Sequence, residues 1–91
     1  MLSIVIPVYQ AEHSIRNLIK KILEVFSNKN LEIILINDCS PDNSHEECLK
    51  VYNENIDKVT YIKLAKNVGE HNAVMAGLNY VKGDWVIIMD D

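Results

Sequence analysis

The sequence predicts an α/β fold, a parallel half-sheet of Rossmann type flanked by helices. Short apolar runs rich in Val and Ile alternate with longer segments of helical periodicity along the 91 residues. The connections between the apolar runs are too long for hairpins, so neighbouring strands are expected to run in the same direction. Because crossovers between parallel strands are right-handed in nearly all proteins, the expected strand order is 3-2-1-4.

The first two strands and the helix between them come from the first 36 residues. Leu2–Val8 is an apolar, β-branched run that predicts a buried strand, and residues 31–36 predict the second. Between them, apolar residues recur at the spacing of an amphipathic helix, with Ser14 placed as its cap: Ile15, Leu18, Ile19, Ile22, Leu23 and Phe26.

The second half of the chain repeats the alternation. Residues 37–44 form a polar turn, Ser44–Glu54 a helix and residues 59–64 the third strand. A turn over residues 67–72 leads into a helix that carries Val74, Leu78 and Val81 and is expected to stop at Gly83. Residues 85–89 predict a buried fourth strand, with Trp85 and Tyr80 as core or helix-edge residues.

Composition indicates one small globular domain. The chain is 48% apolar and 24% charged, which is ordinary for a soluble fold. Its last strand is followed only by Asp90 and Asp91, with no helix to close the fold. We therefore expect residues 1–91 to be a subdomain truncated at its C-terminus.

Charge and cysteine content exclude several classes of partner. The net charge is −4 and the basic residues are scattered, which argues against binding to nucleic acid. Cys39 and Cys48 form no metal-binding motif, and with no signal peptide they fit a cytoplasmic protein, with one loop cysteine and one core cysteine. No apolar run approaches the ~18 residues of a membrane span, so any membrane association is expected from sequence beyond this chain.

The first loop separates the nucleotide-binding alternatives. Residues 9–14 contain no glycine, whereas both the dinucleotide fingerprint and the P-loop need glycines for close approach to phosphate. This disfavours a dehydrogenase, although Asp38 sits where a ribose-binding acid could lie. In open parallel sheets, ligands bind beyond the strand carboxyl ends where the strand order reverses, so Tyr9, Asp38 and Asp90 are expected along one rim.

Four segments in register on the predicted strand ends carry a family resemblance. They are residues 3–9 (SIVIPVY), 36–44 (INDCSPDNS), 67–69 (NVG) with Ala73 and Gly77, and 89–91 (MDD). Together they resemble the family 2 glycosyltransferases of GT-A fold. The match runs over essentially the whole chain.

The resemblance implies an inverting glycosyltransferase whose donor is a nucleotide-diphosphate sugar. It implies that Asp38 accepts a hydrogen bond from the base, and a strand-end carboxylate is a good acceptor for an imide N–H. A helix-capping or turn role for Asp38 is the alternative. The donor-binding residues that it implies are Pro7, Val8, Tyr9, Glu12, Asp38, Asn67, Gly69 and Asp90.

The resemblance also implies a divalent cation, Mg²⁺ or Mn²⁺, at the acidic motif. Asp90 and Asp91 are the metal-ligand candidates, because adjacent carboxylates repel each other unless a cation pairs with them. If the motif is Asp-x-Asp, Asp90 is its first acid. If the motif instead consists of the two adjacent acids, Asp90 contacts the ribose and Asp91 binds the metal.

The residue after Gly69 departs from the pattern of one branch of the family. Members that transfer sugar to polyprenyl phosphate often carry a basic residue after the glycine matching Gly69, whereas this chain has Glu70. The acceptor is expected to be a glycan or a polyprenyl phosphate, the latter at the cytoplasmic face of a membrane. No residue is assigned as catalytic base, and His13 and His45 are given no chemistry.

Two competing classes remain. A flavodoxin-like regulatory domain of the phospho-receiver type would need an acidic pair after the first strand, where this chain has Tyr9 and Gln10. It would also need an Asp after the third strand, where Ala65 and Lys66 stand. A nucleotidyltransferase would need a glycine-rich, basic first loop, whereas residues 9–14 contain no glycine, lysine or arginine.

Overall fold

The computed structural model describes residues 1–90 and has the expected alternation of strands and helices. The elements in chain order are β1 (Leu2–Val8), α1 (Ile15–Val25), β2 (Leu31–Asn37), α2 (Ser44–Glu54), β3 (Val59–Lys63), α3 (Glu70–Leu78) and β4 (Trp85–Ile88).

All the strands form one parallel sheet in the order β3-β2-β1-β4, as predicted. Leu2 of β1 lies opposite Leu31 of β2 on one side and opposite Trp85 of β4 on the other. From β1 to β3 each new strand is added on the same side of the sheet. After β3 the chain crosses back, and β4 is added on the free side of β1.

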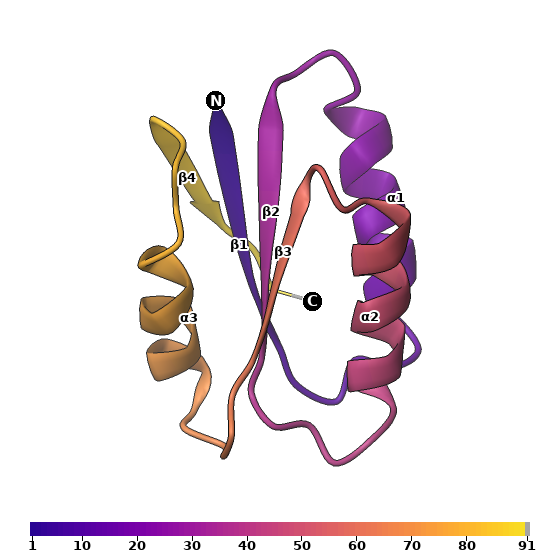
Figure 1. The fold of residues 1–91 in the computed structure, drawn as a ribbon, viewed down its shortest axis with the longest axis vertical. Helices are drawn as coiled ribbons and strands as arrows, with labels where there is room; N and C mark the ends of the chain where they lie inside the picture. The colour runs from indigo at the N-terminus through magenta and orange to yellow at the C-terminus, as the bar shows by residue number, and fades with distance from the viewer. Residues whose placement is uncertain (91) are drawn as a thin grey trace.

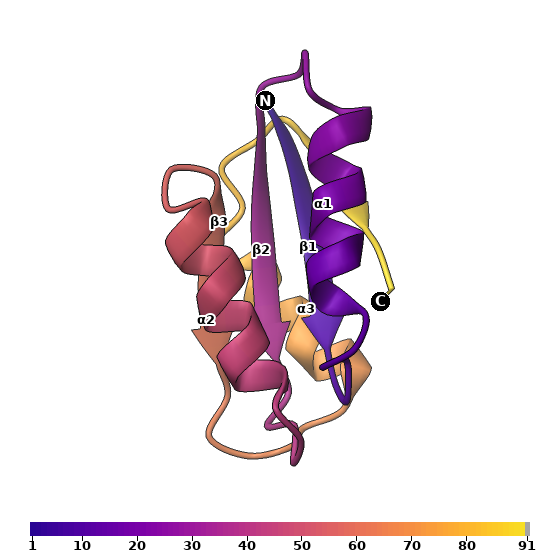
Figure 2. The same ribbon diagram turned by 90° about the vertical axis from the view of Figure 1, so that its right-hand side faces the viewer.

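Helices cover the two faces of the sheet unequally. α1 and α2 lie side by side on one face, and α3 lies alone on the other (Figures 1 and 2). The larger core lies under α1 and α2 and is built mainly from β-branched and leucine side chains that are buried from solvent. Burying one such side chain contributes roughly 1.5–3 kcal/mol, so this layer supplies most of the apolar stabilisation.

α3 approaches the sheet closely through two small residues. Ala73 and Gly77 are both buried and lie one turn apart on the face that packs against Val5 and Ile36. A Cβ at Gly77 would overlap Ile36 Cδ1 and lie 2.9 Å from Ile36 Cγ1 and 3.0 Å from Val5 Cγ1. The small residues Ala73 and Gly77 on this face of the helix are thus a packing requirement.

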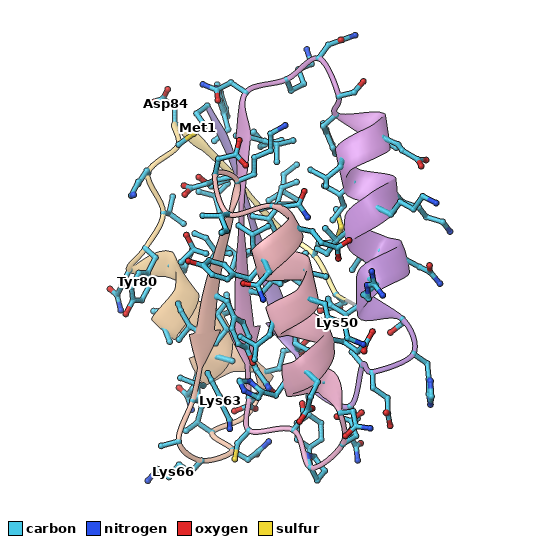
Figure 3. All side chains as sticks on the ribbon, turned by 45° about the vertical axis from the view of Figure 1, so that its right-hand side comes forward. Met1, Lys50, Lys63, Lys66, Tyr80 and Asp84 are labelled. Carbon is cyan, nitrogen blue, oxygen red and sulfur yellow. The ribbon has the colours of Figure 1, made fainter. Side chains whose placement is uncertain are left out.

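A buried carboxylate fastens the turn before β4 to the amino end of the sheet. Glu32, 8% exposed, accepts hydrogen bonds from Ser3 Oγ at 2.6 Å and from the Lys82 N–H at 2.7 Å. Ser3 Oγ in turn accepts the Gly83 N–H at 2.9 Å. Figure 3 shows Met1 and Asp84 together at this end, where the terminal ammonium lies 3.5 Å from the Asp84 carboxylate.

The sequence predicted that the helix stops at Gly83, and this was wrong. α3 ends at Leu78, so Val81 also lies beyond it. A Cβ at Gly83 would lie 2.5 Å from both the Met1 carbonyl oxygen and Ser3 Oγ, so this glycine permits close approach of the turn to β1.

The expectation of a buried fourth strand was wrong. Every residue of β4 is exposed, Trp85 at 74% and Ile88 at 54%, whereas the β1 residues beside them are mostly buried completely. The physical reason is that the helices pack mainly on the other strands: α2 contacts β3 and α3 contacts β1 and β2, whereas the edge strand β4 contacts mainly β1. Tyr80 is also 49% exposed and is not a core residue.

Smaller differences concern element ends. β2 continues through Asn37, β3 stops at Lys63, β4 stops at Ile88, and α3 begins at Glu70, inside the expected turn. Ser14 holds the cap position of α1 but makes no capping hydrogen bond, because its hydroxyl turns back to the Ala11 carbonyl at 3.5 Å. Cys48 is buried and Cys39 lies in a loop, as expected. Within residues 1–90, no helix has the length and apolarity that crossing a bilayer requires.

Replacing Gly77 with alanine should destabilise the protein by about 1–3 kcal/mol, because the added methyl overlaps the Ile36 side chain in a packed layer. On an unhindered helix the same change would stabilise the protein by up to about 1 kcal/mol. A decrease in the free energy of unfolding would therefore be due to the steric overlap. Chemical denaturation measures it. Met75→Ala, at a 51% exposed position of the same helix, should change stability by less than about 0.5 kcal/mol.

Candidate functional site

A cavity of about 550 Å³ opens at the carboxyl edge of the sheet, within the size range of small-molecule sites. It lies where β1 separates β2 from β4, which is the reversal point of the strand order. Its lining residues are Pro7, Val8, Tyr9, Asp38, Asn67, Gly69, Glu70 and Asp90.

The lining comes from four segments that the parallel sheet brings to one edge. The end of β1 supplies the floor, the turn after β2 supplies Asp38, and the loop before α3 supplies Asn67 and Gly69. Asp90 follows β4, whose pairing with β1 is extended by a hydrogen bond from the Met89 N–H to the Val5 carbonyl at 3.0 Å. All the donor-binding residues expected from the sequence line this cavity except Glu12.

Glu12 is half-buried on the turn that leads to α1 and does not line the cavity. Its N–H donates to Asp42 Oδ2 at 3.4 Å, and its carboxylate lies 3.9 Å from His13 Nε2. Its expected contact with the base stays a prediction. The expected metal ligand Asp91 lies outside the described residues.

Asp38 is buried, 3% exposed, and its carboxylate accepts hydrogen bonds from one loop. Oδ1 accepts the Val68 N–H at 2.8 Å, while Oδ2 accepts the Gly69 N–H at 3.0 Å and Asn67 Nδ2 at 3.1 Å. Asn67 Nδ2 also donates to the Asp38 carbonyl at 3.1 Å. The carboxylate thus joins the turn after β2 to the loop before α3.

The loop after β1 has its N–H groups occupied by the protein itself. The N–H groups of residues 10, 11 and 12 donate to Ser40 Oγ at 3.1 Å, Ser44 Oγ at 2.9 Å and Asp42 Oδ2 at 3.4 Å. A phosphate held in the manner of a P-loop would need these donors. The structure therefore supports the exclusion of such a site before α1.

Asp42, in the loop between β2 and α2, holds the loop after β1 in place. It accepts the Ser44 hydroxyl at 2.6 Å and the Ser44 N–H at 3.0 Å through Oδ1. Burial raises the pKa of Asp42, but the hydrogen bonds from Ser44 and from the Glu12 N–H outweigh it, so the pKa lies below its ordinary value. These hydrogen bonds therefore favour the ionised carboxylate, which joins the loop after β1 to the loop after β2.

Backbone strain is concentrated at this edge of the sheet. Gln10 and Cys39 have φ of 52° and 54°, in the left-handed region that non-glycine residues rarely adopt, and Gly69 has φ of 91° with ψ of 155°. Such conformations persist where surrounding contacts impose them and often mark functional loops. Here they occur in the loops after β1 and β2 and directly before α3.

A pair of facing carboxylates was not foreseen. Glu70, the first residue of α3, lines the cavity with Asp90. A hydrogen bond with the Asp90 carboxyl and repulsion from its negative charge raise the pKa of Glu70 above its ordinary value. In the sequence Glu70 stood out only as a departure from a basic residue, and its position opposite Asp90 depends on the crossover from α3 to β4.

The carboxylate pair fits the chemistry of a divalent cation. Two hard oxygen donors that repel each other would gain from a bound Mg²⁺ or Mn²⁺, which prefers such ligands. The described part of the chain contains no group of three residues able to hold a metal. A cation here would therefore complete its coordination from a ligand such as a diphosphate or from water.

A hydrogen-bonded network lies behind Asp38. Asn37 is fully buried; its Nδ2 donates to Tyr61 Oη at 3.0 Å and its Oδ1 accepts the Ser40 N–H at 3.0 Å. Tyr61 Oη lies 2.8 Å from His45 Nδ1. Burial raises the pKa of Tyr61 to about 12, so its hydroxyl stays protonated while it is hydrogen-bonded to the His45 ring. His45, given no chemistry from the sequence, has this structural role.

Comparison with known proteins agrees with this geometry. Residues 3–91 match the model of the family described as glycosyl transferase family 2. The chain is 38% identical over 90 residues to an undecaprenyl-phosphate 4-deoxy-4-formamido-L-arabinose transferase of Edwardsiella ictaluri, covering 97% of this chain and 28% of that protein. The chain thus spans little more than a quarter of the length of that curated relative.

Solved structures show the same fold at lower identity. A structure of S. aureus TarS in complex with UDP-GlcNAc matches with a TM-score of 0.80 and 22% identity, over 98% of this chain and 26% of that one. The mannosyltransferase PcManGT of Pyrobaculum calidifontis, in complex with GDP-Man and Mn²⁺, matches with a TM-score of 0.75 and 20% identity, over the same shares.

The Asp90→Asn variant should lower the pKa of Glu70 toward its ordinary range, because it removes the facing negative charge. A pH titration followed by carbon-13 NMR of the Glu70 carboxyl measures this. Since the folded-state pKa is raised, the stabilising contribution of Glu70 is present below its ordinary pKa and is lost as pH rises through the folded value. An unchanged titration of Glu70 in the variant would show that the two groups do not interact.

Proposed function

This chain belongs to glycosyl transferase family 2, and from this we propose that it forms the donor-binding part of an enzyme that transfers a sugar from a nucleotide-diphosphate sugar to an acceptor. The observation that carries the proposal is the cavity at the strand-order reversal, because it combines an aromatic ring, a buried carboxylate and an open carboxylate pair. The transfer proceeds with inversion at the sugar carbon.

Each part of the donor has a chemically suitable wall. The Tyr9 ring, 48% exposed at the end of β1, offers a surface on which a base can stack. Pro7 and Val8 form an apolar floor, and Asp38 supplies an acceptor for a base N–H. The open side, with Glu70 and Asp90, is left for the ribose and the diphosphate.

The acidic side of the cavity requires a cation for the diphosphate. Negative side chains repel a diphosphate, and the N–H groups of the first loop are already occupied. Asp90, with Asp91 after it, would hold Mg²⁺ or Mn²⁺, which neutralises the charge that develops on the leaving diphosphate. A complex of PcManGT with GDP-Man and Mn²⁺ supports this choice of metal.

The acceptor that we favour is a polyprenyl phosphate, on the strength of the relative named as an undecaprenyl-phosphate transferase. The enzyme would then act at the cytoplasmic face of a membrane, in the synthesis of cell-envelope polysaccharide. None of the residues that line the cavity is assigned as the catalytic base that deprotonates the acceptor. A flavodoxin-like receiver domain would need its acidic pair after β1, whereas the carboxylates of this cavity lie at the start of α3 and after β4.

The metal role gives a direct test by calorimetry with UDP. The intact protein should bind UDP at least about tenfold more tightly with Mn²⁺ than with chelator, a difference of about 1.4 kcal/mol. Asp90→Asn, alone or with Asp91→Asn, should remove most of this difference, because it removes the proposed metal ligands.

Asp84→Asn is the matched control, since this exposed carboxylate lies at the opposite end of the sheet and should leave the metal effect unchanged. Metal-independent binding of UDP by the intact protein would exclude the proposed role of Asp90. Failure to bind UDP, GDP and their sugar conjugates under any condition would exclude the donor site.

A further inference from the structure

The Asp38 carboxylate is engaged by the protein before any ligand arrives. It accepts three hydrogen bonds, from the Val68 N–H, the Gly69 N–H and the Asn67 side chain. A carboxylate has about four acceptor positions, so about one remains, on Oδ1. Because Asp38 is 3% exposed, removing these donors would leave a buried charge poorly satisfied.

These hydrogen bonds fix the loop at the point where it becomes α3. Gly69 has φ of 91° and ψ of 155°, a conformation essentially restricted to glycine, although a Cβ there would meet nothing within 4 Å. Backbone geometry, not lack of space, therefore requires the glycine. The strained conformation aims the Gly69 N–H at Asp38 and starts α3 at Glu70, which lines the cavity.

Asp38 is itself held rigidly from behind. Its N–H donates to the Val8 carbonyl at 2.9 Å, which anchors it to the end of β1. The next residue, Cys39, is in the left-handed region, and Asn37 closes the turn by accepting the Ser40 N–H. The carboxylate is thus a fixed point to which the loop before α3, a segment without regular structure, is attached.

We propose that Asp38 is a positioning residue that holds residues 67–69 as a wall of the donor cavity, with Asn67 as its partner in that task. The inference rests on the proposed function and assigns Asn67 to loop geometry instead of contact with the nucleotide. A base can gain about one hydrogen bond from Asp38 without opening the loop. The wall, and with it the placement of Glu70 opposite Asp90, depends on the carboxylate.

The first test follows the backbone amides of Val68 and Gly69 by hydrogen exchange in the intact protein, without ligand. Asp38→Asn keeps one carbonyl acceptor but turns the other oxygen into an NH2 donor, which cannot accept the N–H opposite it. At least one of the two amides should therefore exchange at least about tenfold faster. Asp42→Asn is the matched control, since Asp42 accepts the Glu12 and Ser44 N–H groups instead, and the change should leave Val68 and Gly69 protected. Protection of both amides in Asp38→Asn would overturn the proposal.

The second test uses Asn67, which is exposed, so that its variants should fold. Asn67→Ala leaves the Asp38 carboxylate intact but removes one donor, and should weaken binding of UDP with Mn²⁺ by roughly threefold to tenfold. Asn67→Asp, nearly the same shape, places a second carboxylate against Asp38 and should weaken binding further. Binding as tight as wild type in both variants would overturn the assignment of Asn67.

The two tests separate this inference from the proposed function. If wild-type protein binds no UDP with Mn²⁺, the donor site fails while the amide exchange still decides whether Asp38 holds the loop. If UDP binds but Asp38→Asn weakens binding without exposing the Val68 and Gly69 amides, Asp38 is a ligand contact only and the positioning role is contradicted.

Discussion

The pairing of β1 with β2 on one side and β4 on the other is the constraint on which the site depends. Since all the strands are parallel, their carboxyl ends meet at one edge, and the reversal of strand order leaves a gap there that no crossover covers. Residues separated by more than 80 positions, from Tyr9 to Asp90, consequently line one cavity. At the opposite edge, Glu32 and Ser3 fasten the turn before β4, which keeps that strand in register.

The electrostatics of the cavity follow from how its donors and acceptors are used. The N–H groups of the loop after β1 donate to serine and aspartate side chains between β2 and α2. Asp38 accepts the N–H groups of the loop before α3. What remains open toward the cavity is acidic, with Glu70 and Asp90 facing each other. Such a site disfavours free anions and favours a cation or a cation-bound anion, which is the chemistry of a nucleotide-diphosphate sugar.

The fold and the meeting of Tyr9, Asp38 and Asp90 at one edge could be predicted from local patterns, whereas the remaining expected lining residues came from the family resemblance. Alternating apolar runs and helical stripes predict a parallel sheet, for which 3-2-1-4 is the usual order of a half-sheet with right-handed crossovers. Parallel strand ends then bring Tyr9, Asp38 and Asp90 together. Three features could not be predicted in this way. The contact between Glu70 and Asp90, the close approach of Gly83 to Met1 and Ser3, and the exposure of Trp85 all depend on how distant segments pack.

A donor-nucleotide site at the carboxyl edge of the sheet is tested most directly by titrating nitrogen-15-labelled intact protein with UDP and Mg²⁺. We predict amide shift changes concentrated at the lining residues, above all Tyr9, Gly69, Glu70 and Asp90. Changes concentrated at Glu32 and Lys82 on the opposite edge, or at the beginning of α1, would contradict a donor site at this position.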